Sequence, residues 1–313
     1  MIRRPIALVL GAGASVPYGF PTARDLLRDI RRGLTDTTFR QRLMSASPGE
    51  AAIQGLREAL AGSPVGSVDE FLEIPAHAGL VGVGKAAIAA SLLPREVPQN
   101  LLPDEKRDDW YEYLFRRMKE GASSFEEFLQ NRIVFVTFNY ERSLEHFLLS
   151  ALRSTYRASP TQVADAVKQN HLRIVHVYGS FGALPYGVEP TIGGILLGQA
   201  AASIHIVGEP DAQAGIDAAQ AALMDCERVC FLGFGYRRAN VDRLALNTTL
   251  RKEAQVFGSA FGLLSGERRD VEQVFAVAKH PIHLSGPGLD ALTALRELTV
   301  LSEFEFRSVA TDS

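Results

Sequence analysis

Two glycines between an apolar run and a helical pattern constrain this chain more than any other feature. Residues 6–9 are all apolar, which predicts a buried strand, and the pattern of residues 22–34 predicts a helix. Gly11 and Gly13 fall in the connection, where the lack of side chains allows a tight turn and lets backbone N–H groups approach a phosphate. A plain turn between strand and helix explains the two glycines equally well, because glycine is the usual residue for a sharp turn.

The connection differs from the dinucleotide fingerprint of ordinary dehydrogenases. The third glycine of G-x-G-x-x-G would fall at Val16, and Pro17 and Pro21 predict a rigid loop between the glycines and the helix. In dehydrogenases an acidic residue about 20 positions further on binds the ribose. Asp25 and Asp29 lie on the predicted helix instead, so we expect a phosphate-binding loop of a non-redox type.

Composition excludes several classes of function. The chain has 313 residues, of which 46% are apolar and 22% are charged, as in a soluble globular α/β protein. Its net charge of −3, without a long basic run, does not indicate nucleic-acid binding through phosphate neutralisation. No signal peptide is evident, and residues 192–207 predict a glycine-broken loop and a strand at 203–207 rather than a membrane span. We therefore expect a cytoplasmic protein with no membrane partner.

The two cysteines, Cys226 and Cys230, do not form a metal-binding pattern. A structural zinc site needs four ligands, commonly two Cys-x-x-Cys pairs, and this chain has one pair at a different spacing. We expect two ordinary core thiols, no zinc or other metal, and a reducing compartment.

Helical patterns dominate the stretch after the first predicted helix. Residues 79–86 are similar to a P-loop, but Ala86 lacks the hydroxyl that binds magnesium and no good strand precedes the run, so we predict a helix there and no ATP site. Trp110 begins an amphipathic pattern whose aromatic residues we assign to the core. Together these patterns predict a large helical insertion at about residues 35–130.

Alternating strands and helices follow this insertion. The strands are predicted at residues 132–141, 172–179, 204–207, 228–232 and 260–264. Helices are predicted between them, and a last helix near residues 289–298. This order predicts an α/β fold, a Rossmann-like doubly wound parallel sheet within a single domain of residues 1–313.

Polar residues stand at the ends of two predicted strands. Asn139 ends one strand, and His176 and Tyr178 are expected on one face of the next because side chains alternate along a strand. A lone histidine is often a structural residue, and Asn139 alone can cap the following helix. Because ligands gather at the carboxyl ends of parallel strands, these residues and the glycine turns together predict one pocket.

Four motifs along the chain share one resemblance. They are G-A-G-A-S at 11–15 with G-F-P-T at 19–22, T-F-N-Y-E at 137–141, H-V-Y-G-S at 176–180 and G-F-G-Y at 233–236. In this order they resemble the sirtuin-like (Sir2-like) NAD-binding family, specifically the bacterial branch that lacks the zinc module and is associated with antiphage defence. The resemblance covers essentially the whole chain.

The resemblance implies a Rossmann-like domain that binds NAD and attacks the bond between nicotinamide and ribose. The first glycine motif would hold the diphosphate, the last would line the adenosine, and residues 20–22 would form the wall at the nicotinamide end. The implied NAD-binding residues are Gly11, Ala12, Gly13, Ala14, Ser15, Phe20, Pro21, Thr22, Thr137, Phe138, Gly179, Gly233, Phe234, Gly235 and Asn240.

The resemblance also implies the catalytic residues. Asn139 would orient the ribose and a water near the anomeric carbon, and a histidine would act as general base. In sirtuin deacylases this histidine directly precedes a glycine, a position that Tyr178 holds here, whereas His176 stands two residues earlier. Tyrosine is a poor base near neutral pH, so we predict His176 as the base and Tyr178 as the alternative.

Three functions follow from this resemblance. The zinc-binding cysteines of the deacylases are absent, which favours an NAD glycohydrolase that produces nicotinamide and ADP-ribose, as in family members that deplete NAD during antiphage defence. The alternative is a catalytically weak NAD or ADP-ribose sensor, and the third is a protein deacylase or ADP-ribosyltransferase. NAD is the expected ligand in each case. We expect a homo-oligomer or a defence-system partner protein to bind the helical insertion.

Overall fold

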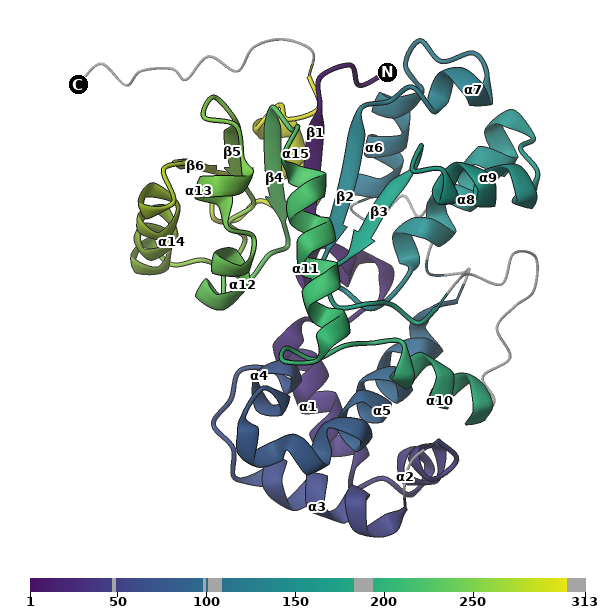
Figure 1. Ribbon diagram of the computed structural model, residues 1–313, viewed down its shortest axis with the longest axis vertical. Helices are drawn as coiled ribbons and strands as arrows, with labels where there is room; N and C mark the ends of the chain where they lie inside the picture. The colour runs from purple at the N-terminus through teal and green to yellow at the C-terminus, as the bar shows by residue number, and fades with distance from the viewer. Residues whose placement is uncertain (47–48, 98–99, 101–108, 183–193, 303–313) are drawn as a thin grey trace.

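Six parallel strands form the central sheet of the computed structural model (Figure 1). The strands are β1 (Ile6–Leu10), β2 (Ile133–Thr137), β3 (Arg173–His176), β4 (Arg228–Leu232), β5 (Gln255–Gly258) and β6 (Ile282–Leu284). They are arranged in the order β3-β2-β1-β4-β5-β6, and all neighbouring pairs are parallel. The structure describes residues 1–46, 49–97, 100, 109–182 and 194–302.

The three central strands, β2, β1 and β4, are buried along their whole length. Parallel strands covered on both faces are expected to be continuous apolar runs, which is how the sequence identified them. The predicted strand at 228–232 is confirmed, and its one charged residue, Arg228, is buried. The Arg228 guanidinium donates from Nη1 to the carbonyl oxygens of Val300 (3.0 Å) and Ser302 (2.5 Å).

Helices cover both faces of the sheet, which confirms the predicted doubly wound α/β fold. In Figure 1, α11 (Pro210–Leu223) crosses in front of the strands, whereas α6 (Trp110–Lys119) and α15 (Ala291–Glu297) lie behind them. α6 contacts both α15 and α8 (Ser143–Tyr156). The other helices of this part are α7 (Phe125–Phe128), α9 (Pro160–Lys168), α12 (Arg238–Arg243), α13 (Leu246–Thr249) and α14 (Ser265–Val277).

A group of helices that we call the helical module lies beyond the carboxyl ends of the strands (Figure 1). Its helices are α1 (Ala23–Gly33), α2 (Thr37–Met44), α3 (Glu50–Ala61), α4 (Val68–Leu72), α5 (Val81–Leu92) and α10 (Gly194–Ala202). α5 contacts each of the others and is the central helix of the module. The module differs in extent from the insertion predicted at 35–130, because α1 and α10 belong to it, whereas α6 lies behind the sheet and α7 lies near the amino end of β2.

The central helix of the module includes the run that is similar to a P-loop. Residues 79–86 lie in the 3-10 helix η2 (Pro75–Leu80) and in α5, so they are helical and form no phosphate-binding loop. Within the described ranges, the stretch Pro75–Arg95 is the one helix long and apolar enough to cross a membrane by length and composition. Half of it is buried among the helices of the module, as in a core helix.

The structure corrects several predictions about secondary structure. Residues 194–202 form α10 rather than a loop, and Ile204 makes only an isolated bridge to Gly179, so the predicted strand at 203–207 is wrong. β5 ends at Gly258, before the strand predicted at 260–264. The first half of the predicted loop at 16–21 is helical instead: residues 16–18, with Pro17 among them, belong to the 3-10 helix η1 (Ala12–Tyr18). β6 has three residues, too few to give a sequence pattern.

The turns after β1 and β4 pack directly against each other. The N–H group of Gly11 donates to the carbonyl oxygen of Leu232 (3.0 Å), and that of Gly13 donates to the carbonyl oxygen of Gly233 (2.9 Å). A Cβ atom on Gly11 would lie 2.6 Å from the Gly233 oxygen, and one on Gly233 would lie 1.9 Å from the Ala14 nitrogen. Gly233 also has a φ of +55°, which disfavours a side chain. This backbone contact therefore requires the glycines.

Gly233→Ala is expected to destabilise the protein by about 3 kcal/mol or more, because the new Cβ overlaps backbone and the positive φ opposes it. Gly235→Ala is the matched control, since a Cβ there meets no atom within 4 Å, and its cost should stay below about 1 kcal/mol. Urea denaturation of both variants measures the difference. Equal stabilities would contradict the requirement for a glycine at position 233.

Candidate functional site

The predicted site residues lie at the carboxyl ends of four neighbouring strands, β3, β2, β1 and β4. The chain leaves β1 for β2 on one side and later reaches β4 on the other side. The carboxyl ends of β1 and β4 therefore mark the switch point of the sheet, which is where open α/β folds bind their ligands. We call this region the edge between β1 and β4. The four motifs, distant in sequence, thus come together along one edge.

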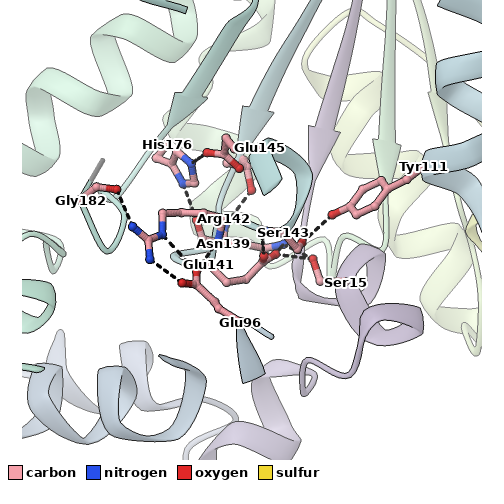
Figure 2. A network of polar contacts seen from close by, with 11 residues as sticks. Ser15, Glu96, Tyr111, Asn139, Glu141, Arg142, Ser143, Glu145, His176 and Gly182 are labelled. Carbon is pink, nitrogen blue, oxygen red and sulfur yellow. Dashed lines mark hydrogen bonds and ion pairs between the residues drawn. The ribbon is translucent and has the colours of Figure 1, made fainter. Parts of the chain in front are cut away.

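Asn139 joins the end of β2 to the turn after β1 (Figure 2). Its side-chain Nδ2 donates to the carbonyl oxygen of Gly11 (3.2 Å) and to Ser15 Oγ (3.1 Å). Its backbone N–H donates to Thr137 Oγ1 (3.0 Å), which fixes the turn after the strand. Ser15 Oγ in turn donates to Glu141 Oε1 (2.5 Å). The predicted residues Asn139 and Ser15 therefore belong to one hydrogen-bonded cluster.

Glu141 is the buried carboxyl group of this cluster and is only 7% exposed. Its Oε2 accepts a hydrogen bond from the backbone N–H of Ser143 (2.6 Å), and the Ser143 hydroxyl is hydrogen-bonded to the Tyr111 hydroxyl (2.7 Å). Burial raises the pKa of Glu141, and the hydrogen bonds from Ser143 and Ser15 offset only part of this effect. Glu141 therefore holds a proton more tightly than an ordinary glutamate does.

Aromatic residues of α6 hold η1, and with it Ser15, against the sheet. Trp110 Nε1 donates to the carbonyl oxygen of Ala14 (2.8 Å). The rings of Tyr18 and Tyr111 stack with their centroids 3.9 Å apart, and the Tyr111 N–H donates to the Tyr18 hydroxyl (2.9 Å). Trp110 and Tyr111 are fully buried, so their predicted core role is confirmed.

His176 is held through both nitrogens of its ring (Figure 2). Nε2 lies 2.6 Å from Glu145 Oε1, and Nδ1 lies 2.8 Å from the backbone carbonyl oxygen of Asn139. A carbonyl oxygen and a carboxylate accept hydrogen bonds, so both ring nitrogens face acceptors and neither is free to take a proton from a substrate. Burial alone would lower the pKa of His176, but Glu145 and the Asn139 carbonyl raise it above its ordinary value. This arrangement argues against His176 as a general base.

Tyr178 lies apart from His176, because β3 ends at His176 and the alternation of the strand does not continue. The Tyr178 hydroxyl accepts a hydrogen bond from Arg243 Nη1 (2.9 Å) and lies 3.5 Å from Asn240 Oδ1. Its ring meets Phe138 edge-on, with centroids 5.7 Å apart. Burial raises the pKa of Tyr178, and Arg243 offsets only part of the effect, so Tyr178 is no base near neutral pH.

Other residues predicted to bind NAD already have structural partners. The N–H groups of Gly11 and Gly13 donate to the turn after β4, so these two groups are not free for a diphosphate. Thr22 caps α1 by accepting a hydrogen bond from the first turn. Gly179 meets the backbone of Ser203, whose oxygen would lie 2.2 Å from a Cβ. Of the rest, the buried residues are Ala14, Phe20 and Phe234, and the partly or fully exposed ones are Ala12, Pro21, Gly235 and Asn240.

Most of the charged residues around Asn139 were not predicted from the sequence. Arg142 Nη2 lies 2.5 Å from Glu96 Oε2, in an ion pair whose side chains are 5% and 0% exposed. The motif N-Y-E-R at 139–142 contains a signal for Glu141 and Arg142, because two charged residues come shortly after a buried strand. Glu145 follows one turn into the next helix. Glu96 has no such signal, since it lies 46 residues away in sequence from Arg142.

The described part of the chain contains no group of three or more His, Cys, Asp or Glu side chains that could hold a metal ion. Cys226 and Cys230 are buried free thiols, and burial raises the pKa of Cys226 to about 11. A hollow of about 420 Å³ between α7, α8 and α9 lies at the amino end of the sheet, away from the cluster around Asn139. We therefore do not assign it to the same site.

Neither a scan against protein-family models nor a search of curated proteins finds a match to this chain. The candidate site therefore rests on its own geometry and on the four sequence motifs.

Glu145→Gln is expected to lower the pKa of His176, because the effect of burial then dominates. Histidine side-chain NMR titration measures this pKa, with the His176 signal assigned through its loss in His176→Gln. Glu272→Gln, an exposed glutamate of α14, is the matched control and should leave the titration unchanged. An unaltered His176 pKa in Glu145→Gln would contradict the ion pair.

The same pair makes the stability of the protein depend on pH. The pKa of His176 is raised, so its contribution is complete below the ordinary value of 6.5 and is lost as pH rises through the folded-state pKa. Burial alone would raise the pKa of Glu145, but His176 lowers it, so its contribution is present above 4.5 and is lost as pH falls through the folded-state pKa. Both contributions are complete between pH 4.5 and pH 6.5. In this range Glu145→Gln should reduce the free energy of unfolding by about 2 kcal/mol, with smaller losses at lower and higher pH, as measured by urea denaturation.

Proposed function

We propose that this chain is an NAD glycohydrolase, which binds NAD at the edge between β1 and β4 and hydrolyses it to nicotinamide and ADP-ribose. The observation that carries the proposal is the convergence of Asn139, Ser15 and Glu141 at the switch point of a Rossmann-like sheet. The resemblance of the four motifs to the zinc-less bacterial sirtuin-like branch also supports it.

Glu141 and Asn139 have complementary roles in the proposed reaction. When the bond to ribose breaks, nicotinamide leaves as a neutral molecule and an oxocarbenium-like ribose remains. Water adds its oxygen to the anomeric carbon and gives a proton to a base. We assign this base to Glu141, whose raised pKa makes its carboxylate a stronger base than that of an ordinary glutamate, and which takes the role first assigned to His176. Asn139 would orient the ribose and the water.

Asn139→Ala and Glu141→Gln are each expected to reduce nicotinamide release from NAD by about 100-fold or more, the usual contribution of a positioned base or orienting group. Chromatography of the products measures the release. Asn247→Ala and Glu272→Gln change the same residue types at exposed positions and should keep the wild-type rate. Full activity in either site variant would remove that residue from the mechanism.

The wild-type rate is expected to rise with pH through the pKa of Glu141, because the base must be ionised to accept a proton. His176→Gln should keep this rise if its fold is intact by circular dichroism. Loss of the pH-dependent rise in a folded His176→Gln variant would return the role of base to His176.

A second candidate function is an NAD or ADP-ribose sensor that binds without turnover. The observation that favours it is that both ring nitrogens of His176 are engaged by acceptors within the protein. In addition, Tyr178 holds the position that the resemblance assigns to the deacylase histidine. A sensor would bind NAD in calorimetry without releasing nicotinamide, and Asn139→Ala would keep much of its affinity. A deacylase or ADP-ribosyltransferase would release nicotinamide only with an acylated peptide or a protein acceptor present.

A further inference from the structure

Two arginines converge on one carboxylate where the helical module meets the sheet. Arg237 binds Glu73 with both ends of its guanidinium, Nη2 to Oε2 at 3.0 Å and Nη1 to Oε1 at 3.3 Å. Arg243 Nη2 lies 3.5 Å from the same Glu73 Oε2. Glu73 is the C-cap of α4 in the module, whereas the arginines lie at the two ends of α12 on the sheet side.

The arginine pair belongs to the same edge as the predicted NAD-binding residues. Arg243 donates from Nη1 to the Tyr178 hydroxyl (2.9 Å) and to Asn240 Oδ1 (2.8 Å). The Tyr178 ring meets Phe138 edge-on at 5.7 Å, and Phe138 meets Phe234 edge-on at 5.0 Å. This line of contacts connects the arginines to the turn after β4, which packs on the turn after β1.

One carboxylate, Glu73, contacts both guanidinium groups. Asp69, one turn earlier on α4, accepts a hydrogen bond from the Tyr140 hydroxyl (2.5 Å). Burial raises the pKa of this carboxyl group, and the hydrogen bond and the nearby Arg237 offset part of that effect. Asp242, on α12 itself, pairs with the exposed Arg238. A diphosphate carries more negative charge than the Glu73 carboxylate whose contacts with the two arginines it would replace.

A dinucleotide needs donors for its diphosphate, and the N–H groups of Gly11 and Gly13 are already used. Guanidinium groups match phosphate oxygens with two parallel hydrogen bonds. We propose that Arg237 and Arg243 form a binding site for the diphosphate of the ligand and that Glu73 occupies this site in the ligand-free protein. The ligand and the C-terminal end of α4 then compete for the same two arginines.

Exposure of the pair is consistent with such competition. The Arg237 side chain is 36% exposed, so an anion can reach it from solvent, whereas Arg243 and Glu73 are 19% and 17% exposed. Ion pairs that are partly exposed contribute little net stability, so a more highly charged anion can displace the Glu73 carboxylate. The proposal rests on the proposed function for the identity of the ligand, but anion binding itself is measurable without turnover.

The test is calorimetric binding of ADP-ribose and of inorganic pyrophosphate at fixed ionic strength. Glu73→Gln removes the competing carboxylate and should tighten both ligands about tenfold, because hydrogen bonds to charged groups are worth that much in affinity. Arg237→Gln should weaken both about tenfold. Arg238→Gln, which changes an exposed arginine of the same helix, is the matched control and should stay within about twofold. Circular dichroism verifies the fold of each variant.

Two outcomes would overturn the site. Affinities that do not change in Glu73→Gln would show that this carboxylate does not compete, and equal effects of Arg237→Gln and Arg238→Gln would reduce the site to general surface charge. Failure of the two proposals is distinguishable. If Glu73→Gln binds ADP-ribose more tightly and Arg237→Gln more weakly, but no nicotinamide is released from NAD, the hydrolase proposal fails and the arginine site stands. If NAD is hydrolysed but the variants bind ADP-ribose as the wild type does, only the arginine site fails.

Discussion

The backbone contact between the turns after β1 and β4 is the constraint on which the rest of the structure depends. Gly11, Gly13 and Gly233 approach so closely that a Cβ on any of them would overlap backbone atoms. This contact sets the direction in which the chain leaves β1, and therefore where η1 presents Ser15 to Asn139. The glycines that resemble an NAD-binding motif are thus required for packing between the two turns, whether or not a ligand also binds there.

The burial of charge then distinguishes Glu141 from its neighbours. Glu96 and Glu145 each lie against a cation, so their charges are compensated inside the protein. The hydrogen bonds that Glu141 accepts come from a hydroxyl, an amide side chain and a backbone N–H, all of them neutral. Burying a carboxyl group whose hydrogen bonds all come from neutral groups has a desolvation cost, and groups perturbed in this way are concentrated at functional sites.

Charged side chains also connect the helical module to the sheet. Among the connecting ion pairs are Glu96–Arg142, Glu73–Arg237 and Lys85–Glu209. Of these, the first is almost completely buried and fixes the loop after β2, whereas the second is partly exposed and open to competition by an anion. The proposed anion site thus lies at the more exposed of these two connections. A site at such a boundary between two packed units is where small-molecule ligands are commonly bound.

The sequence by itself determined the central strands and the placement of Asn139 and the glycine motifs at strand ends, because apolar runs and turn residues act locally. It failed at residues 194–202, where a run of Gly, Leu and Ala fits a loop or a helix equally, and at β6, which is too short for a pattern. Only the tertiary structure decided that His176 is held at both nitrogens and that Glu141 is buried with hydrogen bonds from neutral groups. Each of these facts depends on partners that come from other strands, helices and turns, and the strength of an ionisable group is set by all of its neighbours in space rather than by its neighbours in the chain.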